Sequence, residues 1–145
     1  GEVDKRYLAL VHGRIERAQG TIDAPIDRDP LEPHIRIVTP SGYPSVTHYE
    51  AAARFPEATL VRLRLETGRT HQIRVHMQSL GHPLVGDKMY GPAESGPLHM
   101  ERHALHAEQL SFVHPGTQAR MTFTAPVPED MASLLRKLGA SSMET

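Results

Sequence analysis

Hydrophobic and polar residues alternate along much of the chain, which is the two-residue period of half-buried strands. The clearest case is residues 59–66, where three aliphatic residues alternate with three charged ones. A strand here places Val61 and Leu63 on one face and a basic row, Arg62 and Arg64, on the other. Further strands are predicted between clusters of Pro and Gly, at residues 7–11 (ended by Gly13), 21–26, 34–38 and 45–53.

The period then changes to that of a helix. Ile73, Met77 and Leu80 recur at helical spacing, and Gly81 stops the run. Thr70 is the predicted N-cap, since its hydroxyl suits the unpaired backbone N–H groups at a helix start. Residues at i, i+3 and i+7 form a shared polar face: His71, Arg74 and Gln78.

The C-terminal third predicts a hairpin and a short helix. Two strands, 104–113 and 119–125, flank a His-Pro-Gly-Thr turn. A helix follows over residues 129–138, and the tail after Gly139 is expected to fray. One side of this helix carries its apolar residues: Met131, Leu134, Leu135 and Leu138. The chain shows no repeat, low-complexity segment or linker, so residues 1–145 are predicted to form a single α+β unit, mainly antiparallel sheet with short flanking helices.

Composition narrows the class of protein. The chain has 145 residues, of which 39% are hydrophobic and 23% charged. This balance excludes a fibrous or wholly disordered protein. The absence of cysteine excludes a disulfide framework and thiolate chemistry and fits a reducing compartment, so a cytoplasmic location is expected. No apolar run approaches the about 18 residues of a membrane-spanning helix.

The charge is nearly balanced overall but unevenly distributed. The net charge is −1, yet 13 of the 16 basic residues are arginine. Residues 33–86 hold six arginines against three acidic residues. Arginine suits bidentate recognition of phosphates and bases, so this region is a candidate nucleic-acid contact if its arginines cluster. Arginines scattered over an ordinary surface are the alternative.

The chain contains ten histidines, so we considered a metal site, but the spacing of the histidines does not support one. His71 and His76 are five residues apart and point to different sides of a helix. His99 and His103 have the helical i, i+4 spacing but follow a Gly-Pro segment. No H-E-x-x-H pattern is present, so we interpret the histidines as surface and loop residues and predict no metal site. Neither a G-x-S-x-G nucleophile turn nor a phosphate-binding glycine loop occurs.

The segment at residues 64–76 carries the strongest chemical signal. A strand runs through a tight Gly turn into a helix N-terminus, where backbone N–H groups and the helix dipole favour an anion. Arg69 and Arg74 add two guanidinium groups. One interpretation is a site that holds a phosphate or a buried carboxylate. The other is that the two arginines pair with Glu66 and Asp87 and only hold the turn.

These residues resemble a known enzyme family. The run L-E-T-G-R-T-H-Q-I-R-V-H (65–76) is similar to the third motif of the RluA-type pseudouridine synthases, which isomerise uridine in ribosomal and transfer RNA. The similarity continues through L-G-H-P-L-V-G-D-K-M-Y-G (80–91). Upstream, K-R-Y-L-A-L-V-H-G (5–13) resembles K-x-Y-x-A-x-V-x-G, and residues 20–28 resemble G-x-I-x-x-P-I-x-R. Downstream, residues 102–107 and 110–115 match the family's closing segment.

Two family motifs are absent from these 145 residues. The family's catalytic aspartate lies in an H-R-L-D segment upstream of the tyrosine stretch, and none of the six aspartates here follows Arg-Leu. The lysine-proline-x-glycine opening of the family is absent as well. We therefore expect the C-terminal portion of a synthase catalytic domain, which lacks the nucleophile and is inactive by itself.

The resemblance implies roles for individual residues. Tyr7 corresponds to the tyrosine that stacks on the flipped uracil and is the candidate base for its C5 proton. Arg74 corresponds to the arginine that pairs with the catalytic aspartate, and Ile73 lies beside the base. Further RNA contacts are expected from the basic row and the turn: Arg62, Arg64, Arg69 and His71. The implied mechanism needs no cofactor or metal, and the partner is RNA. The alternative function is a non-catalytic RNA-binding module.

Overall fold

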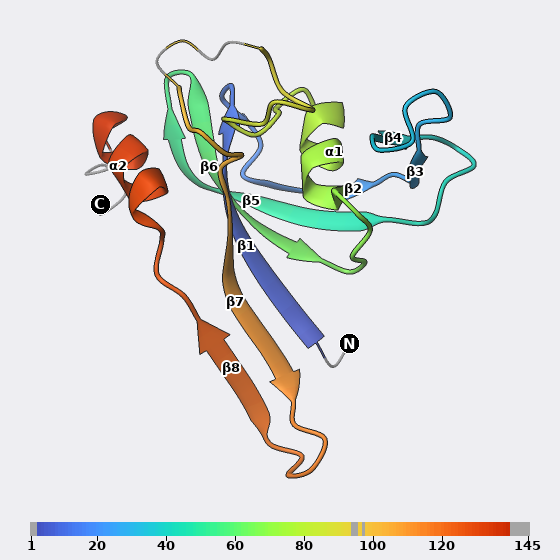
Figure 1. Ribbon diagram of the computed structural model, residues 1–145. Coiled ribbons are helices and arrows are strands. Elements are labelled where there is room, and N and C mark those ends of the chain that lie inside the picture. Colours follow the sequence, from blue (N-terminus) through green and yellow to red (C-terminus); the bar gives the residue numbers. More distant parts are fainter. Residues whose placement is uncertain (1–2, 94–95, 97, 140–145) are drawn as a thin grey trace.

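A six-stranded antiparallel sheet in the order β2-β5-β6-β1-β7-β8 forms the body of the protein (Figure 1). The computed structural model describes residues 3–93, 96 and 98–139. Two helices and a small second sheet complete the fold, so the predicted α+β class is confirmed. The elements are β1 (Val3–His12), β2 (Gln19–Asp23), β3 (Ile26–Arg28), β4 (Arg36–Val38), β5 (Val46–Phe55), β6 (Ala58–Leu65), α1 (Gln72–Ser79), β7 (Leu105–Val113), β8 (Arg120–Thr124) and α2 (Glu129–Lys137).

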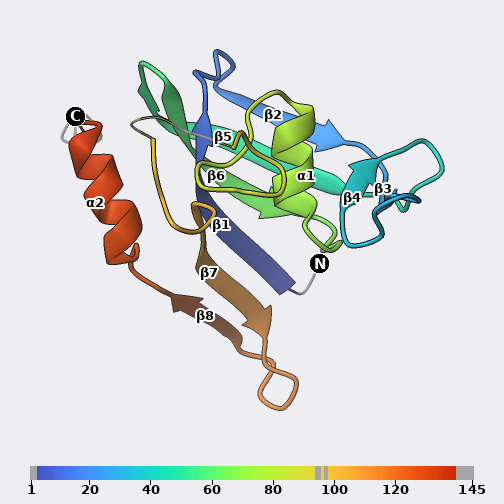
Figure 2. The same cartoon turned by 45° about the horizontal axis from the view of Figure 1, so that its top comes forward.

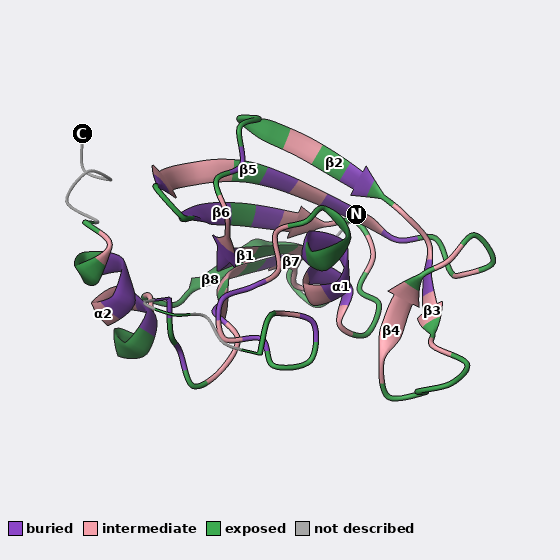
Figure 3. Ribbon diagram, turned by 90° about the horizontal axis from the view of Figure 1, so that it is seen from above, coloured by how far each residue is buried: buried purple, intermediate pink, exposed green. Residues whose placement is uncertain are grey.

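Strand β1 lies in the middle of the sheet, and its second half is buried on both faces. It pairs with β6 on one side and with β7 on the other. Its four residues from Leu8 to Val11 are all buried, which explains why they form a continuous apolar run rather than an alternating one. Figure 3 shows β6 as mostly buried, whereas β8 is intermediate or exposed.

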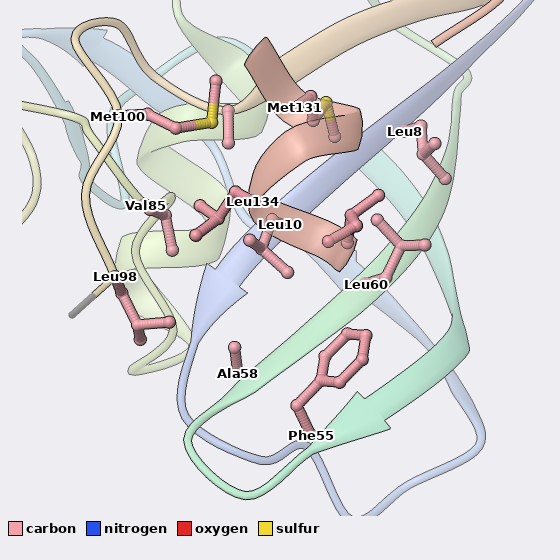
Figure 4. Close-up of a cluster of buried hydrophobic side chains, with 12 residues drawn as sticks. Leu8, Leu10, Phe55, Ala58, Leu60, Val85, Leu98, Met100, Met131 and Leu134 are labelled. Carbon is pink, nitrogen blue, oxygen red and sulfur yellow. The ribbon is translucent and has the colours of Figure 1, made fainter. Parts of the chain in front are cut away.

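The two faces of β1 support two separate cores. Leu8 and Leu10 pack into a cluster with Met131 and Leu134 of α2, which Figure 4 shows in close-up. The alternate residues of β1 join a second cluster that includes Ile73 and Met77 of α1. Figures 1 and 2 accordingly place α1 and α2 on either side of β1. A residue's position in β1 therefore decides which helix it faces.

The predicted strand at residues 21–26 is wrong in one respect, because the chain breaks it in two. Ile22 pairs with Thr47 in the main sheet, whereas Ile26 pairs with Val38 in the small β3-β4 sheet. The break falls at Pro25, which has no backbone N–H to donate to a ladder. The strand predicted at 34–38 is correspondingly short, since only β4 is regular.

Helix α1 forms where predicted but starts differently. Thr70 is not its N-cap; that position is His71, in the left-handed conformation with φ 58° and no side-chain capping bond. The predicted stop is confirmed, because Gly81 has φ 90° and donates its N–H to the carbonyl of Gln78. Leu80, expected on the apolar face, is 39% exposed.

The C-terminal hairpin and helix are confirmed. Strands β7 and β8 pair in antiparallel register, and Met131, Leu134 and Leu135 of α2 are buried. The tail expected to fray lies outside the described residues. Within the described part of the chain, no helix is long and apolar enough to cross a membrane.

Candidate active site

A pocket of about 230 Å³ opens where β1, the end of β6 and the start of α1 meet. We call it the Tyr7 pocket. Leu65, Gln72, His103 and Leu105 complete its wall. Five of the seven site residues predicted from the sequence line it: Tyr7, Arg69, His71, Ile73 and Arg74. The structure thus brings Tyr7 next to residues 69–74, which lie far from it in the sequence.

Tyr7 reaches the pocket because of its place in β1. It pairs with Leu63 of β6 and packs at the margin of the core that lies under α1. The pairing of β1 with β7 shifts register between Arg6 and Tyr7. Such an irregularity changes the direction of a side chain locally.

Arg74 forms a side-on ion pair with Asp87. Its Nε donates to Oδ2 at 2.8 Å and its Nη2 donates to Oδ1 at 3.0 Å. The Arg74 side chain is 14% exposed and the Asp87 side chain is 0% exposed. Of the two interpretations drawn from the sequence, pairing of Arg74 with Asp87 is therefore confirmed. No described residue accepts from Nη1, so that edge of the guanidinium is available to another ligand.

Asp87 collects further donors. Its Oδ1 also accepts from the backbone N–H groups of Met89 at 3.1 Å and Tyr90 at 3.0 Å. Burial by itself would raise the pKa of Asp87, but the hydrogen bonds from Arg74 and these amides outweigh it and lower the pKa. The same pair raises the pKa of Arg74. Both groups are therefore ionised at neutral pH.

Tyr90 connects three other parts of the site. The Arg74 guanidinium carbon lies 5.0 Å from the centre of its ring. The Tyr90 hydroxyl accepts from the backbone N–H of Arg36 at 2.9 Å and is 2.8 Å from Nδ1 of His71. Tyr90 is 4% exposed, so these contacts form in the interior, behind the pocket wall.

Two histidines line the pocket as neutral groups. Burial lowers the pKa of His71, and the positive charges of Arg74 and Arg36 lower it further. Burial and then Arg74 lower the pKa of His103 in the same way. The wall therefore offers neutral imidazoles next to a permanent cation.

Arg69 does not form the ion pair with Glu66 that the sequence suggested as one alternative. Its Nε donates to the carbonyl of Pro44 at 3.0 Å, and its guanidinium lies 5.5 Å from the ring centre of Tyr43. Glu66 instead contacts His48 of β5. Arg69 is held by a carbonyl and a ring, and no described carboxylate pairs with its positive charge at the pocket rim.

The basic row of β6 lies on the other face of the sheet. Arg62 and Arg64 point away from Val61 and Leu63, as predicted, and so they do not line the Tyr7 pocket. They border a separate hollow of about 170 Å³, together with Arg6 of β1. We call it the back hollow. Arg62 and Arg64 therefore lie away from Tyr7 and Arg74.

Sequence reasoning assigned no role to three residues that shape the site: Gln72, Tyr90 and His103. It named Asp87 only as a partner that holds the turn. Gln72 accepts from the Thr67 hydroxyl and the Arg69 N–H and donates to the carbonyl of Val46, so it fixes the turn before α1. The sequence did point to the segment that holds Asp87 and Tyr90, because both belong to the family-like run at residues 80–91. Among the described residues, no three His, Cys, Asp or Glu side chains come close enough to hold a metal ion.

Solved structures place this fold among the pseudouridine synthases. The human RNA pseudouridylate synthase domain containing 1 is 30% identical with a TM-score of 0.73, over 96% of this chain and 66% of that one. The human RNA pseudouridylate synthase domain containing 4 has a TM-score of 0.76 at 22% identity, over 94% of this chain and 62% of that one, and shows the fold alone.

The sequence profile described as RNA pseudouridylate synthase matches residues 1–79, and the chain belongs to this family. It is 52% identical, over 94% of its length, to an uncharacterized RNA pseudouridine synthase, YjbO, of Bacillus subtilis. It is 44% identical, again over 94% of its length, to the ribosomal large subunit pseudouridine synthase D of Nitrosomonas europaea. The chain spans 47% and 41% of the lengths of these two relatives.

Proposed function

We propose that this chain forms the uridine-binding part of an RluA-type pseudouridine synthase, which isomerises uridine to pseudouridine in structured ribosomal or transfer RNA. The observation that carries the proposal is the convergence of Tyr7, Ile73 and Arg74 on one pocket in a chain of this family. In this reaction the bond from C1′ to N1 of uracil breaks. The base then turns, C1′ bonds to C5, and C5 loses its proton while N1 gains one.

The pocket supplies the apolar and stacking surfaces for a single base. Tyr7 stacks on the flipped uracil and is placed to take the C5 proton, and Ile73 packs against the base edge. Extracting a base from its stack costs a few kcal/mol, which stacking and phosphate contacts offset. Arg69 lies on the rim, where no described carboxylate pairs with its charge, and is positioned for the phosphate that follows the flipped nucleotide.

The nucleophile in this proposal comes from outside these 145 residues. No carboxylate among the described residues lines the Tyr7 pocket, and Asp87 is too deeply buried behind Arg74 to reach a sugar. The family's H-R-L-D aspartate meets Arg74 at its open Nη1 edge. Arg74 then bridges two carboxylates, a structural one through Nε and Nη2 and a catalytic one through Nη1.

Flanking RNA follows the positive groups beside the pocket. A neighbouring hollow of about 390 Å³ shares Tyr7, Leu65 and Arg69 with it and adds Lys5. Arg62 and Arg64 contact more distant phosphates on the back of the sheet. The name of the Nitrosomonas relative favours large-subunit ribosomal RNA as the substrate and, with it, a cytoplasmic location.

Release of tritium from RNA labelled at C5 of uridine tests the proposal. The full-length protein should release tritium from its target RNA in stoichiometric amount without added metal or cofactor. RNA binding with strong inverse salt dependence but no tritium release would instead establish a non-catalytic RNA-binding module.

A further inference from the structure

Two polar side chains of the Tyr7 pocket are held by a segment that does not itself line the pocket. Asp87 binds Arg74, and Tyr90 binds His71. Tyr90 follows Asp87 by three residues. Asp87 also accepts from the N–H of Tyr90, so the two holding residues are fixed to each other. One short turn therefore sets the position of both polar groups.

The hydrogen bonds of Tyr90 define the proton positions on His71. The hydroxyl of Tyr90 already accepts from the N–H of Arg36, and its own proton needs an acceptor. The only acceptor within reach among the described residues is Nδ1 of His71, at 2.8 Å. Tyr90 therefore donates to Nδ1, and the proton of the neutral imidazole lies on Nε2. No described residue accepts from Nε2, which keeps this N–H available to a ligand.

The backbone conformation agrees with such a constraint. His71 has φ 58°, a left-handed conformation that is costly for a residue with a Cβ. It occupies the N-cap position of α1 but makes no side-chain capping bond, so capping does not explain this conformation. Strained residues of this kind occur where the surrounding contacts over-determine them, often at functional sites. Here the contact with Tyr90 is the one that anchors the ring.

We propose that Asp87 and Tyr90 are positioning residues of the catalytic site: Asp87 fixes the guanidinium of Arg74, and Tyr90 fixes His71 as an Nε2–H donor to the RNA in the pocket. The acceptor is a carbonyl oxygen of the base or a phosphate oxygen beside it. This inference rests on the proposed function and names two residues through which the pocket achieves it. The groups that act electrostatically on His71 are Arg74, Arg36, Asp87 and His103, and none of them supplies the hydrogen bond to Nδ1.

The first test measures the tautomer directly. In the full-length protein labelled with 15N-histidine, the nitrogen chemical shifts of His71 should show a protonated Nε2 and an unprotonated Nδ1. Tyr90→Phe should abolish this preference, and Tyr49→Phe is the matched control, because Tyr49 is also buried but no described residue bonds to its hydroxyl. A protonated Nδ1 in the wild type, or an unchanged tautomer in Tyr90→Phe, would overturn the assignment.

The second test uses the tritium-release reaction. Tyr90→Phe should lower kcat about tenfold with little change in KM, by analogy with residues that orient a reactive side chain. It should also move the acidic limb of the pH profile to higher pH, because the neutral imidazole loses the donor that stabilises it. A purely structural role would lower the melting temperature and leave this limb in place, which would count against the proposal.

Asp87→Asn should lower kcat in the same assay, and Asp130→Asn is its control. Asp130 forms an equally side-on pair with Arg102, at 2.9 and 3.0 Å, but on the exposed side of α2. Equal effects of the two substitutions on kcat would overturn the role of Asp87. A wild-type protein without tritium release would overturn the proposed function instead, and the tautomer measurement would still decide the role of Tyr90.

Discussion

The hydroxyl of Thr47 in β5 lies 2.8 Å from Nδ1 of His76 in α1 and joins the helix to the sheet through a fully buried imidazole. The other ring nitrogen, Nε2, donates to the carbonyl of Ala24 at 2.9 Å. Thr47 itself accepts from the side chain of Gln72 at 2.9 Å and therefore donates to His76. Nδ1 of His76 can accept this hydrogen bond only when the imidazole is neutral, so the network requires a neutral His76.

Acid should therefore destabilise the protein before its carboxylates titrate. Burial lowers the pKa of His76 below its unfolded value of about 6.5. A group with a lowered folded pKa contributes stability above the unfolded pKa, and this stability is lost as the pH falls towards the folded pKa. Urea unfolding from pH 7.5 to pH 5 should show a falling free energy of unfolding. His76→Gln should flatten the decline, and an undiminished slope in this variant would contradict a neutral His76.

Two glycines with similar backbone angles should respond very differently to alanine. Gly86 has φ 80°, and a Cβ there would lie 2.2 Å from the carbonyl oxygen of Arg102. Gly81 has φ 90°, but a Cβ would meet nothing within 4 Å. We expect Gly86→Ala to cost about 3 kcal/mol or more and Gly81→Ala about 1 kcal/mol. Denaturant titration measures both, and equal losses would show that the chain relaxes around Gly86.

Removal of Arg74 should separate binding from catalysis. In the full-length protein, Arg74→Ala should nearly abolish tritium release while RNA affinity survives. It should also destabilise the fold by about 3–5 kcal/mol, because Asp87 is left as an uncompensated buried charge. Arg102→Ala is the control, since its partner Asp130 is exposed and the loss should stay within about 1 kcal/mol. Equal losses of binding and turnover would argue against pairing of Arg74 with a catalytic aspartate.

The back of the sheet should affect RNA affinity rather than chemistry. Arg62→Ala and Arg64→Ala should each weaken binding, raise KM and reduce the salt-dependence slope by about 1, while kcat stays unchanged. Binding titrations over a range of salt concentrations, paired with single-turnover rates, measure these effects. A fall in kcat for either variant would show that the back hollow communicates with the Tyr7 pocket.

The sequence predicted the parts of the fold that depend on local pattern. Alternation located β6 and assigned Arg62 and Val61 to opposite faces, because side chains of a strand alternate regardless of its partners. The predicted start of α1 at Thr70 was wrong. The turn before the helix is fixed by Gln72, whose side chain bonds to Thr67 and to the carbonyl of Val46, and Thr70 does not act as the cap. The bond from Gln72 depends on Val46 of β5, which lies far away in the sequence, so local pattern does not reveal it.

The site, like the fold, was predicted only where a local sequence pattern specifies it. Two separate family-like segments, 5–13 and 65–76, identified Tyr7 and Arg74, since their residue types and spacing belong to the family's motifs. Asp87 was predicted only as a partner that holds the turn. The role of Tyr90 depends on contacts across the fold, and no period or spacing in the chain specifies it. Arg69 shows the same limit, because the carbonyl of Pro44 that binds it is visible only in three dimensions.

Strand β1 precedes the other described strands in the sequence, yet it pairs with β6 and with β7, which follow it by many residues. Contacts between residues so distant in the sequence close large loops, and folding is slow when such contacts dominate. During synthesis on the ribosome, β6 becomes available to β1 first and β7 only later. The apolar run from Leu8 to Val11 lacks part of its final cover in that interval, so we expect the nascent chain to be prone to association at this stage.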